Sequence, residues 1–293
     1  MSRESKLPEP TPLTRGDIER LAQFHHPQLM LSELPYAKAL DDVHLSAAFG
    51  LDAATYRSIL ESFAAQARRI ALRLTDQHAV RECISTVFAE EDRIVALGDS
   101  ITEDSQSWAE ILSQVMKLIR PKDGIRVINA GLSGDTTADL ISRFVRLAEG
   151  TPTWVMVMIG TNDARRHGTP PSEMMVSHAE SERNLAALGQ LVRTHTEARI
   201  VWVTPPPVLE NRVASSGTLR RDHLTWRQHD VAAKRKLVRA LPDLVVDPWS
   251  ETTPRRLEGL LSEDGVHPNL RGQQNIATCV IMALANQLRL EVA

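Results

Sequence analysis

The sequence is poor in several features that mark specialised classes of protein. Its 293 residues include two cysteines, Cys83 and Cys279, too few for a disulfide framework, and neither has a second Cys or a His at metal-ligand spacing. We interpret both as small buried apolar side chains. No apolar run reaches the roughly 18 residues of a membrane-spanning helix, and the first ten residues lack the apolar core of a signal peptide. We therefore expect no membrane span, no metal site and a cytoplasmic protein.

The net charge and the share of aromatic residues are also low. The formal net charge is −3 and the arginine pairs are scattered along the chain, whereas a nucleic-acid surface requires a concentrated basic patch. Aromatic residues make up 4% of the chain, and the loop after the first expected strand is not a Ser/Thr-rich phosphate cradle. We therefore expect no nucleic-acid partner, no flavin and no other cofactor.

The N-terminal region, residues 1–90, shows no strand-like alternation and has helical patterns after a short arm. Residues 1–13 are polar and contain proline, which is typical of a loose arm. Helical patterns follow from Thr14 to Pro27 and from about 36 to 49. The longest pattern runs from 56 to 74, where apolar residues recur every three or four positions after a possible cap at Asp52. Such a stripe needs a partner surface, and a homodimer is one way to cover it.

No chemistry can be assigned to this helical region from its sequence. Its histidines (His25, His26 and His44) lack metal-ligand spacing, and Tyr36 and Tyr56 are interpreted as packing residues. The region can cap a site, form an oligomer contact or add a helical layer.

From residue 91 to 293 the pattern changes to alternating strands and helices, which predicts a parallel sheet covered on both faces. The strands are expected at 93–97, 126–129, 154–159, 199–203 and 244–246. The helices are expected at about 106–120, 136–148, 172–195, 222–240 and 269–290. The strands are short and continuously apolar, as expected for strands buried on both faces.

The stretch Gly98-Asp99-Ser100 directly follows the first expected strand. A hydroxyl between a buried strand and a helix lies at the edge of an open α/β sheet, where ligands bind. Ser100 is therefore the candidate nucleophile. Alone, an Asp-Ser pair is more often a turn or a helix cap.

Two further segments follow the second and third strands. Gly134, in Ser133-Gly134-Asp135, is expected at the start of a helix, where its N–H points outward and the missing Cβ lets a ligand approach. Asn162 follows the most apolar strand and can direct its amide toward the same point, while Asp163 shapes the loop. Both donors suit an oxyanion.

The fourth segment is Asp264-Gly265-Val266-His267. A turn brings a carboxylate to an imidazole three residues later, which leaves the second ring nitrogen free to face Ser100. The four segments together provide a nucleophile, a base with its carboxylate, and oxyanion donors.

These four segments, in this order and over about 200 residues, resemble the four sequence blocks of the GDSL, or SGNH, hydrolase family. The resemblance implies a flavodoxin-like three-layer α/β/α fold with a five-stranded parallel sheet, extended here by the all-helical N-terminal region. It implies serine esterase, lipase, thioesterase or carbohydrate-esterase activity on a small-molecule ester, without a metal. It assigns Ser100 as nucleophile, His267 as base, Asp264 as its partner, and Gly134 and Asn162 as oxyanion donors. Ile101 stands where the family name has leucine.

Two alternatives to an ester hydrolase stay open at this point. An acyltransferase on the same scaffold uses a metabolite or sugar hydroxyl in place of water. A non-catalytic binding or scaffold protein would work through its helical region, although all five expected catalytic positions are filled.

Overall fold

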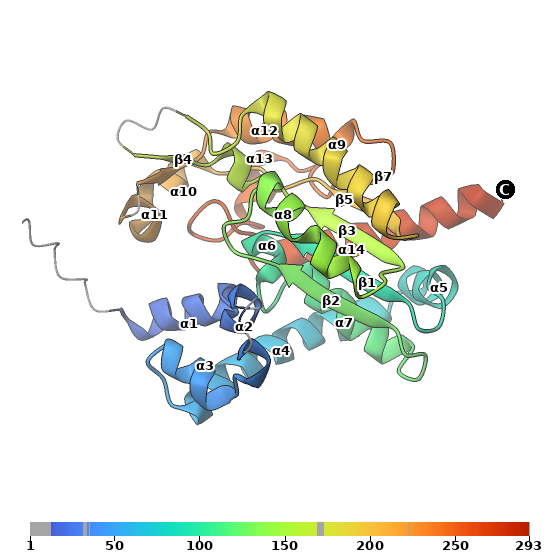
Figure 1. Ribbon diagram of the computed structural model, residues 1–293, viewed down its shortest axis with the longest axis horizontal. Helices are drawn as coiled ribbons and strands as arrows, with labels where there is room; N and C mark the ends of the chain where they lie inside the picture. The colour runs from blue at the N-terminus through green and yellow to red at the C-terminus, as the bar shows by residue number, and fades with distance from the viewer. Residues whose placement is uncertain (1–12, 32–33, 35, 169–172, 222, 293) are drawn as a thin grey trace, which may run out of the picture.

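The computed structural model describes residues 13–31, 34, 36–168, 173–221 and 223–292 (Figure 1). The expected arm at 1–13 lies outside the described residues apart from Leu13. Within the described ranges, no helix is both long and apolar enough to cross a bilayer.

A five-stranded parallel sheet forms the centre of the molecule. Its strand order is β2-β1-β3-β5-β7, which is the flavodoxin-like order, and all neighbours in it are parallel. The strands are β1 (Arg93–Gly98), β2 (Arg126–Gly131), β3 (Trp154–Met158), β5 (Arg199–Val203) and β7 (Leu244–Val246). The predicted fold class is confirmed, and each strand lies within two residues of its expected bounds.

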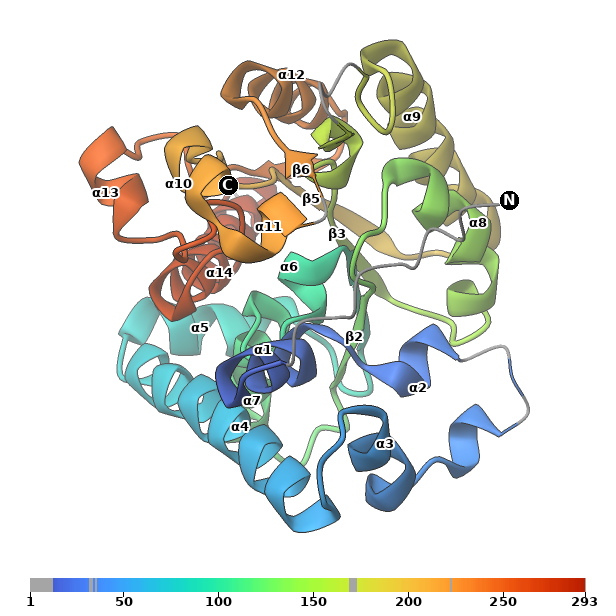
Figure 2. The same cartoon turned by 90° about the vertical axis from the view of Figure 1, so that its left-hand side faces the viewer.

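Successive strand residues point to opposite faces and divide the core in two. Ile94 and Ala96 of β1 pack with one set of helices, and Val95 and Leu97 pack with the other. The first face is covered by α7 (Trp108–Ile119) and α14 (Leu270–Val292). The second is covered by α8 (Thr137–Ala148), α9 (His178–His195) and α12 (Gln228–Arg239) (Figure 2). These layers give the predicted α/β/α arrangement.

The N-terminal helices form an additional layer on the first face (Figure 2). The apolar stripe of α4 (Ala53–Thr75) packs on α7, and α5 (His78–Val87), which the sequence reading did not identify, packs on α14. The buried residues Ala67, Ile70 and Leu74 belong to the same core cluster as the sheet. The stripe is therefore covered largely from within the chain.

The remaining N-terminal elements are short. They are α1 (Arg15–Phe24), α2 (Pro27–Met30), the 3₁₀ helix η1 (Ala37–Ala39) and α3 (Asp42–Ala48). The expectation of a single helix at about 36–49 is therefore wrong. The segment contains η1 and α3 as separate helices, because Asp41 caps a new helix by accepting the N–H groups of Val43 and His44.

Two other helices begin later than expected. Leu224–Thr225 (β6) pairs antiparallel with Arg166–His167 (β4), so α12 starts at Gln228 instead of 222. The helix expected from 172 starts at His178, after the cap Ser177. Residues 169–172 and 222 lie outside the described residues. The short helices around the site are α6 (Ser100–Glu103), η2 (Asn162–Ala164), α10 (Glu210–Ser215), α11 (Gly217–Arg221) and α13 (Pro254–Glu258).

The two cysteines differ from each other. Cys83 is buried, and burial raises the pKa of its thiol to about 12. Cys279 is half-buried, so it meets the expectation of a buried apolar side chain only in part.

Candidate active site

Ser100 lies at the carboxyl edge of the sheet, at the beginning of α6. Asp99 caps this helix by accepting the Ile101 N–H at 3.0 Å. Gly98 is required just before it, since a Cβ there would lie 2.6 Å from the Met158 carbonyl oxygen. β2 lies on one side of β1 and β3 on the other, which is the topological switch point where ligands bind in open α/β sheets.

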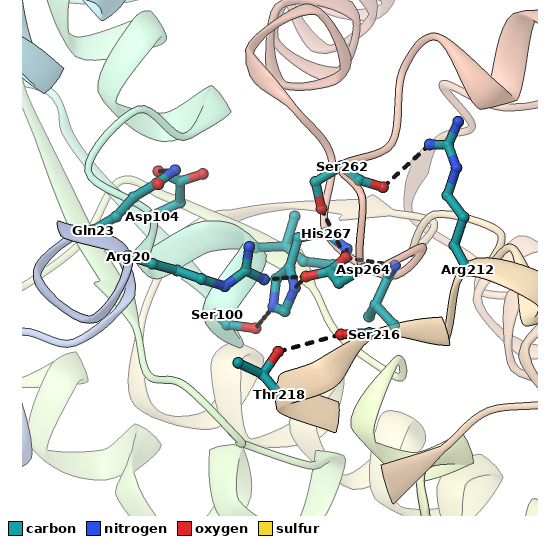
Figure 3. A network of polar contacts seen from close by, with 12 residues as sticks. Arg20, Gln23, Ser100, Asp104, Arg212, Ser216, Thr218, Ser262, Asp264 and His267 are labelled. Carbon is teal, nitrogen blue, oxygen red and sulfur yellow. Dashed lines mark hydrogen bonds and ion pairs between the residues drawn. The ribbon is translucent and has the colours of Figure 1, made fainter. Parts of the chain in front are cut away.

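The loop between α13 and α14 brings a histidine and a carboxylate to Ser100 (Figure 3). The Ser100 Oγ lies 2.9 Å from His267 Nε2, and His267 Nδ1 lies 2.7 Å from Asp264 Oδ2. An ionised carboxylate can only accept, so Nδ1 carries the proton and Nε2 presents its lone pair to the hydroxyl. The three residues form one continuous hydrogen-bonded chain.

Asp264 is strongly held in its ionised form. Burial by itself would raise its pKa, but His267 and Arg20 nearby hold the pKa well below the usual range of an aspartate. Its Oδ1 accepts the N–H groups of Val266 at 2.9 Å and His267 at 3.0 Å, and the Ser262 hydroxyl at 2.7 Å. This turn fixes the carboxylate independently of the imidazole.

Gly134 and Asn162 line the same pocket as Ser100 and His267. The expected position of Gly134 at a helix start is wrong, because α8 begins at Thr137 after the cap Thr136. Gly134 lies instead in the preceding turn with φ +92°, a left-handed conformation that favours glycine.

The Asn162 amide has a defined orientation. Its Nδ2 donates to the Asp135 carbonyl at 3.0 Å, and its Oδ1 accepts from Arg165 Nη1 at 3.1 Å. Because a guanidinium only donates, the oxygen must face Arg165. One Nδ2 hydrogen is used by Asp135, which leaves the second for another acceptor.

The neighbouring Asp163 holds its loop in shape through hydrogen bonds to two helices. Its carboxylate accepts the Thr137 N–H and hydroxyl, both at 2.8 Å, and the Ser181 hydroxyl at 2.5 Å. It therefore joins η2 to α8 and α9, in agreement with its expected role in loop shape. Of the two arginines that follow, Arg165 lines the pocket, whereas Arg166 is buried against Asp230 at 2.9 Å.

A cavity of about 310 Å³ opens beside Ser100. The α/β region lines it with Ser100, Ser133, Gly134, Thr161, Asn162, Arg165, Thr218, Leu219, Leu224, Trp226, Val266 and His267. The N-terminal region lines it with Leu13, Asp17, Arg20, Leu21, Phe24 and His25.

Capping of a site was one of the roles left open for the N-terminal region, but no residue of α1 was predicted to contribute to it. The Arg20 guanidinium pairs with Asp264 Oδ2, and the Phe24 ring centroid lies 4.7 Å from that of His267. A capping box of Thr14 and Asp17 marks the start of this helix, but no local motif shows where it packs. His25, directly after α1, also lines the cavity, and burial lowers its pKa.

Several carboxyl groups are buried around the site. Burial raises the pKa of Asp99 to about 7, and the pKa values of Asp104 and Asp135 to about 6. Asp99 Oδ2 is buried without a hydrogen-bond partner among the described residues. In that part of the chain no cluster of three or more His, Cys, Asp or Glu side chains suits a metal ion.

Comparison with known proteins identifies the class. The profile of the GDSL-like lipase/acylhydrolase family matches residues 96–274, and the chain belongs to this family. An arylesterase of Vibrio mimicus is 26% identical over 212 residues, which are 70% of this chain and 94% of that protein. Esterase TesA of Pseudomonas aeruginosa is 25% identical over 195 residues, 64% of this chain and 85% of that protein.

Solved structures agree on the fold. A catalytic mutant of an acetylxylan esterase from Geobacillus stearothermophilus aligns with a TM-score of 0.51 at 22% identity, over 68% of this chain and 96% of that one. Together, the family and its esterase relatives define this protein as an ester hydrolase of the serine type. The helix α1 precedes the matched residues.

Proposed function

We propose that Ser100, His267 and Asp264 are the catalytic triad of this ester hydrolase, and that the N–H groups of Ser100 and Gly134 and the amide of Asn162 form its oxyanion hole. The observation that carries the proposal is the hydrogen-bonded chain from Ser100 Oγ through the imidazole to Asp264, with distances of 2.9 and 2.7 Å. The Ser100 end of this hydrogen-bonded chain lies in a cavity that Gly134 and Asn162 also line.

In the first half of the reaction, His267 Nε2 removes the Ser100 hydroxyl proton while Oγ forms a bond to the ester carbonyl carbon. The carbonyl oxygen becomes an oxyanion, which the three donors stabilise. The bond to the leaving alcohol then breaks, His267 returns the proton to that oxygen, and an acyl-Ser100 ester remains.

In the second half, water replaces the alcohol. His267 takes a proton from water as its oxygen attacks the acyl carbon. The bond to Ser100 Oγ then breaks, Oγ regains a proton from His267, and the free acid leaves. Asp264 stays ionised throughout and stabilises the imidazolium that forms in each half.

The apolar lining of the cavity favours esters with an apolar acyl or aryl group as substrates. Besides its polar end at Ser100, it is lined by the apolar side chains of Leu21 and Phe24 from α1 and of Leu219, Leu224 and Trp226. Burial of apolar substrate surface against such walls contributes roughly 25 cal/mol per Å². We propose that this cavity takes the acyl side of the ester.

Ser100→Ala tests the proposal directly. Hydrolysis of p-nitrophenyl esters, from acetyl to palmitoyl, is expected to fall by a factor on the order of 10⁴ or more in this variant, because the triad acts as a unit. Ser85→Ala, an exposed change on α5, is the matched control and keeps wild-type activity. A Ser100→Ala protein that still turns over these esters contradicts the assignment.

Three finer expectations stay predictions. They are a cytoplasmic location, a homodimer and the lack of a nucleic-acid partner. Cell fractionation, the native mass in solution and nucleic-acid binding assays decide them in turn.

A further inference from the structure

The helix α1 is part of the active site although it lies outside the residues that match the family. Its last turn is fastened to the loops that carry Ser100 and Gly134. The Gln23 carbonyl accepts the Ser105 N–H at 2.9 Å, and the Gln23 side chain donates to Asp104 at 3.0 Å. The Ser133 hydroxyl donates to the Phe24 carbonyl. These bonds fix the helix in place over the site.

Arg20 projects from this helix onto the carboxylate of the triad (Figure 3). Its guanidinium pairs with Oδ2 of Asp264, the same oxygen that accepts His267 Nδ1. The Arg20 side chain is 37% exposed, whereas Asp264 is 3% exposed. The guanidinium carbon also lies over the Phe24 ring, 5.4 Å from its centroid. A permanent cation therefore sits next to the proton-transfer pair.

Asp264 does not need Arg20 to hold its geometry. Its Oδ1 is already held by Val266 N–H, His267 N–H and the Ser262 hydroxyl. The added effect of Arg20 is therefore one of charge. A carboxylate oxygen shared between a guanidinium and an imidazole attracts an imidazolium proton less strongly than one that the imidazole has to itself.

The other titratable groups around His267 are Asp264 on its own loop, His25 after α1, and Asp99 and Asp104 around α6. Two further charged residues, Asp17 of α1 and Arg165, line the same cavity. Burial lowers the pKa of His25 and so disfavours a positive charge on that ring. Arg20 is the group on the α1 side that stays positive at every pH of interest.

We propose that Arg20 acts on His267 through Asp264 and is in this sense a positioning residue of the triad. Because it shares Asp264 Oδ2, its positive charge keeps His267 unprotonated at a lower pH than the rest of the site would allow. The enzyme thereby stays active further into the acid range. This inference rests on the proposed roles of Ser100 and His267.

The test is the pH dependence of kcat/KM for p-nitrophenyl acetate, measured on quenched samples between about pH 5 and 9. Arg20→Met keeps a long unbranched side chain and removes the charge. Its acid limb is expected to move up by about half to one pH unit. Arg20→Lys keeps a cation at this position, and its limb is expected near that of the wild type.

Arg15→Met is the matched control. Arg15 lies on the same helix, its side chain is 80% exposed, and it pairs with Glu19 one turn further on. Removing its charge is expected to leave the limb unmoved. Arg20→Gln is a second neutral variant, used if Arg20→Met loses cooperative thermal unfolding, and the same upward displacement is required of it.

The outcomes separate the two proposals. If the neutral variants lower the plateau but leave the acid limb in place, Arg20 merely fastens α1 and the inference is overturned. If Arg20→Lys moves the limb as far as Arg20→Met, charge is not the cause and the inference is again overturned. Activity that survives in Ser100→Ala overturns the proposed function itself, whatever the Arg20 variants do.

Discussion

The α/β region and the N-terminal helices meet at one pocket but contribute to it differently. The α/β region supplies polar groups from turns that directly follow strands, such as Ser100 after β1 and Asn162 after β3. The N-terminal region supplies side chains from one face of α1, among them Arg20 and Phe24. The reacting groups thus come from local turn geometry, and part of the wall and the charge balance comes from a packed helix.

The two regions are also held in place by different forces. The α/β core is built from strands buried on both faces. The helix α1 rests on a small cluster of Ala22, Tyr56 and Ile59, and on hydrogen bonds to loops of the site. Changes in the first region are therefore expected to affect chemistry, and changes in the second to affect binding and pH dependence.

Asn162→Ala tests the chemical half of this comparison and has the largest expected effect of the three variants that follow. Loss of one oxyanion donor lowers kcat by about 10²–10³, with little change in KM, because the donor acts on charge that develops in the transition state. Steady-state kinetics on one p-nitrophenyl ester measures both constants. A wild-type kcat in this variant would remove Asn162 from the oxyanion hole.

Asp99→Asn tests how much folding stability the buried Asp99 carboxyl of the site costs the α/β region. An aspartate in an unfolded chain ionises near pH 3.9, whereas burial raises the pKa of Asp99 to about 7 in the folded protein. Between these values the folded state binds the extra proton, so stability falls as the pH rises from about 4 to 7. The variant keeps an oxygen to cap α6 and removes this titration.

The loss of unfolding free energy between about pH 4 and 8 is therefore expected to be about 4 kcal/mol smaller in Asp99→Asn than in the wild type. Denaturant unfolding at both pH values measures it. Asp76→Asn, at an exposed position after α4, is the control. Wild-type and Asp99→Asn curves that fall in parallel would show that Asp99 is ionised throughout.

Leu21→Ala tests the binding half and has the smallest expected effect. Leu21 lines the cavity from α1, and loss of its side chain is expected to raise KM about tenfold for medium-length acyl esters, with kcat nearly unchanged. Acetyl esters are too short to reach this wall and keep their KM. Leu72→Ala, an exposed change on α4, serves as control. Equal effects on every acyl length would show that α1 does not contact the acyl group.

Much of the α/β region was predictable from sequence. Strands buried on both faces appear as short apolar runs, and the predicted flavodoxin-like order is confirmed. The i, i+3 spacing of Asp264 and His267 predicts a turn that joins them, and the structure contains that hydrogen bond. The start of α8 was predicted to within one residue. The turn at Gly134 and the pairing of β4 with β6 were not predicted, because the short segments involved fit more than one local structure.

The sequence by itself therefore determined the sheet, the family and the group of side chains proposed for the chemistry, because each depends on patterns within a few neighbouring residues. Only the tertiary structure decided that α1 closes one side of the pocket and that Arg20 reaches Asp264. These two residues are 244 positions apart. Their contact results from packing α1 on α4, and α4 on α7, and no local pattern encodes such a sum of long-range contacts.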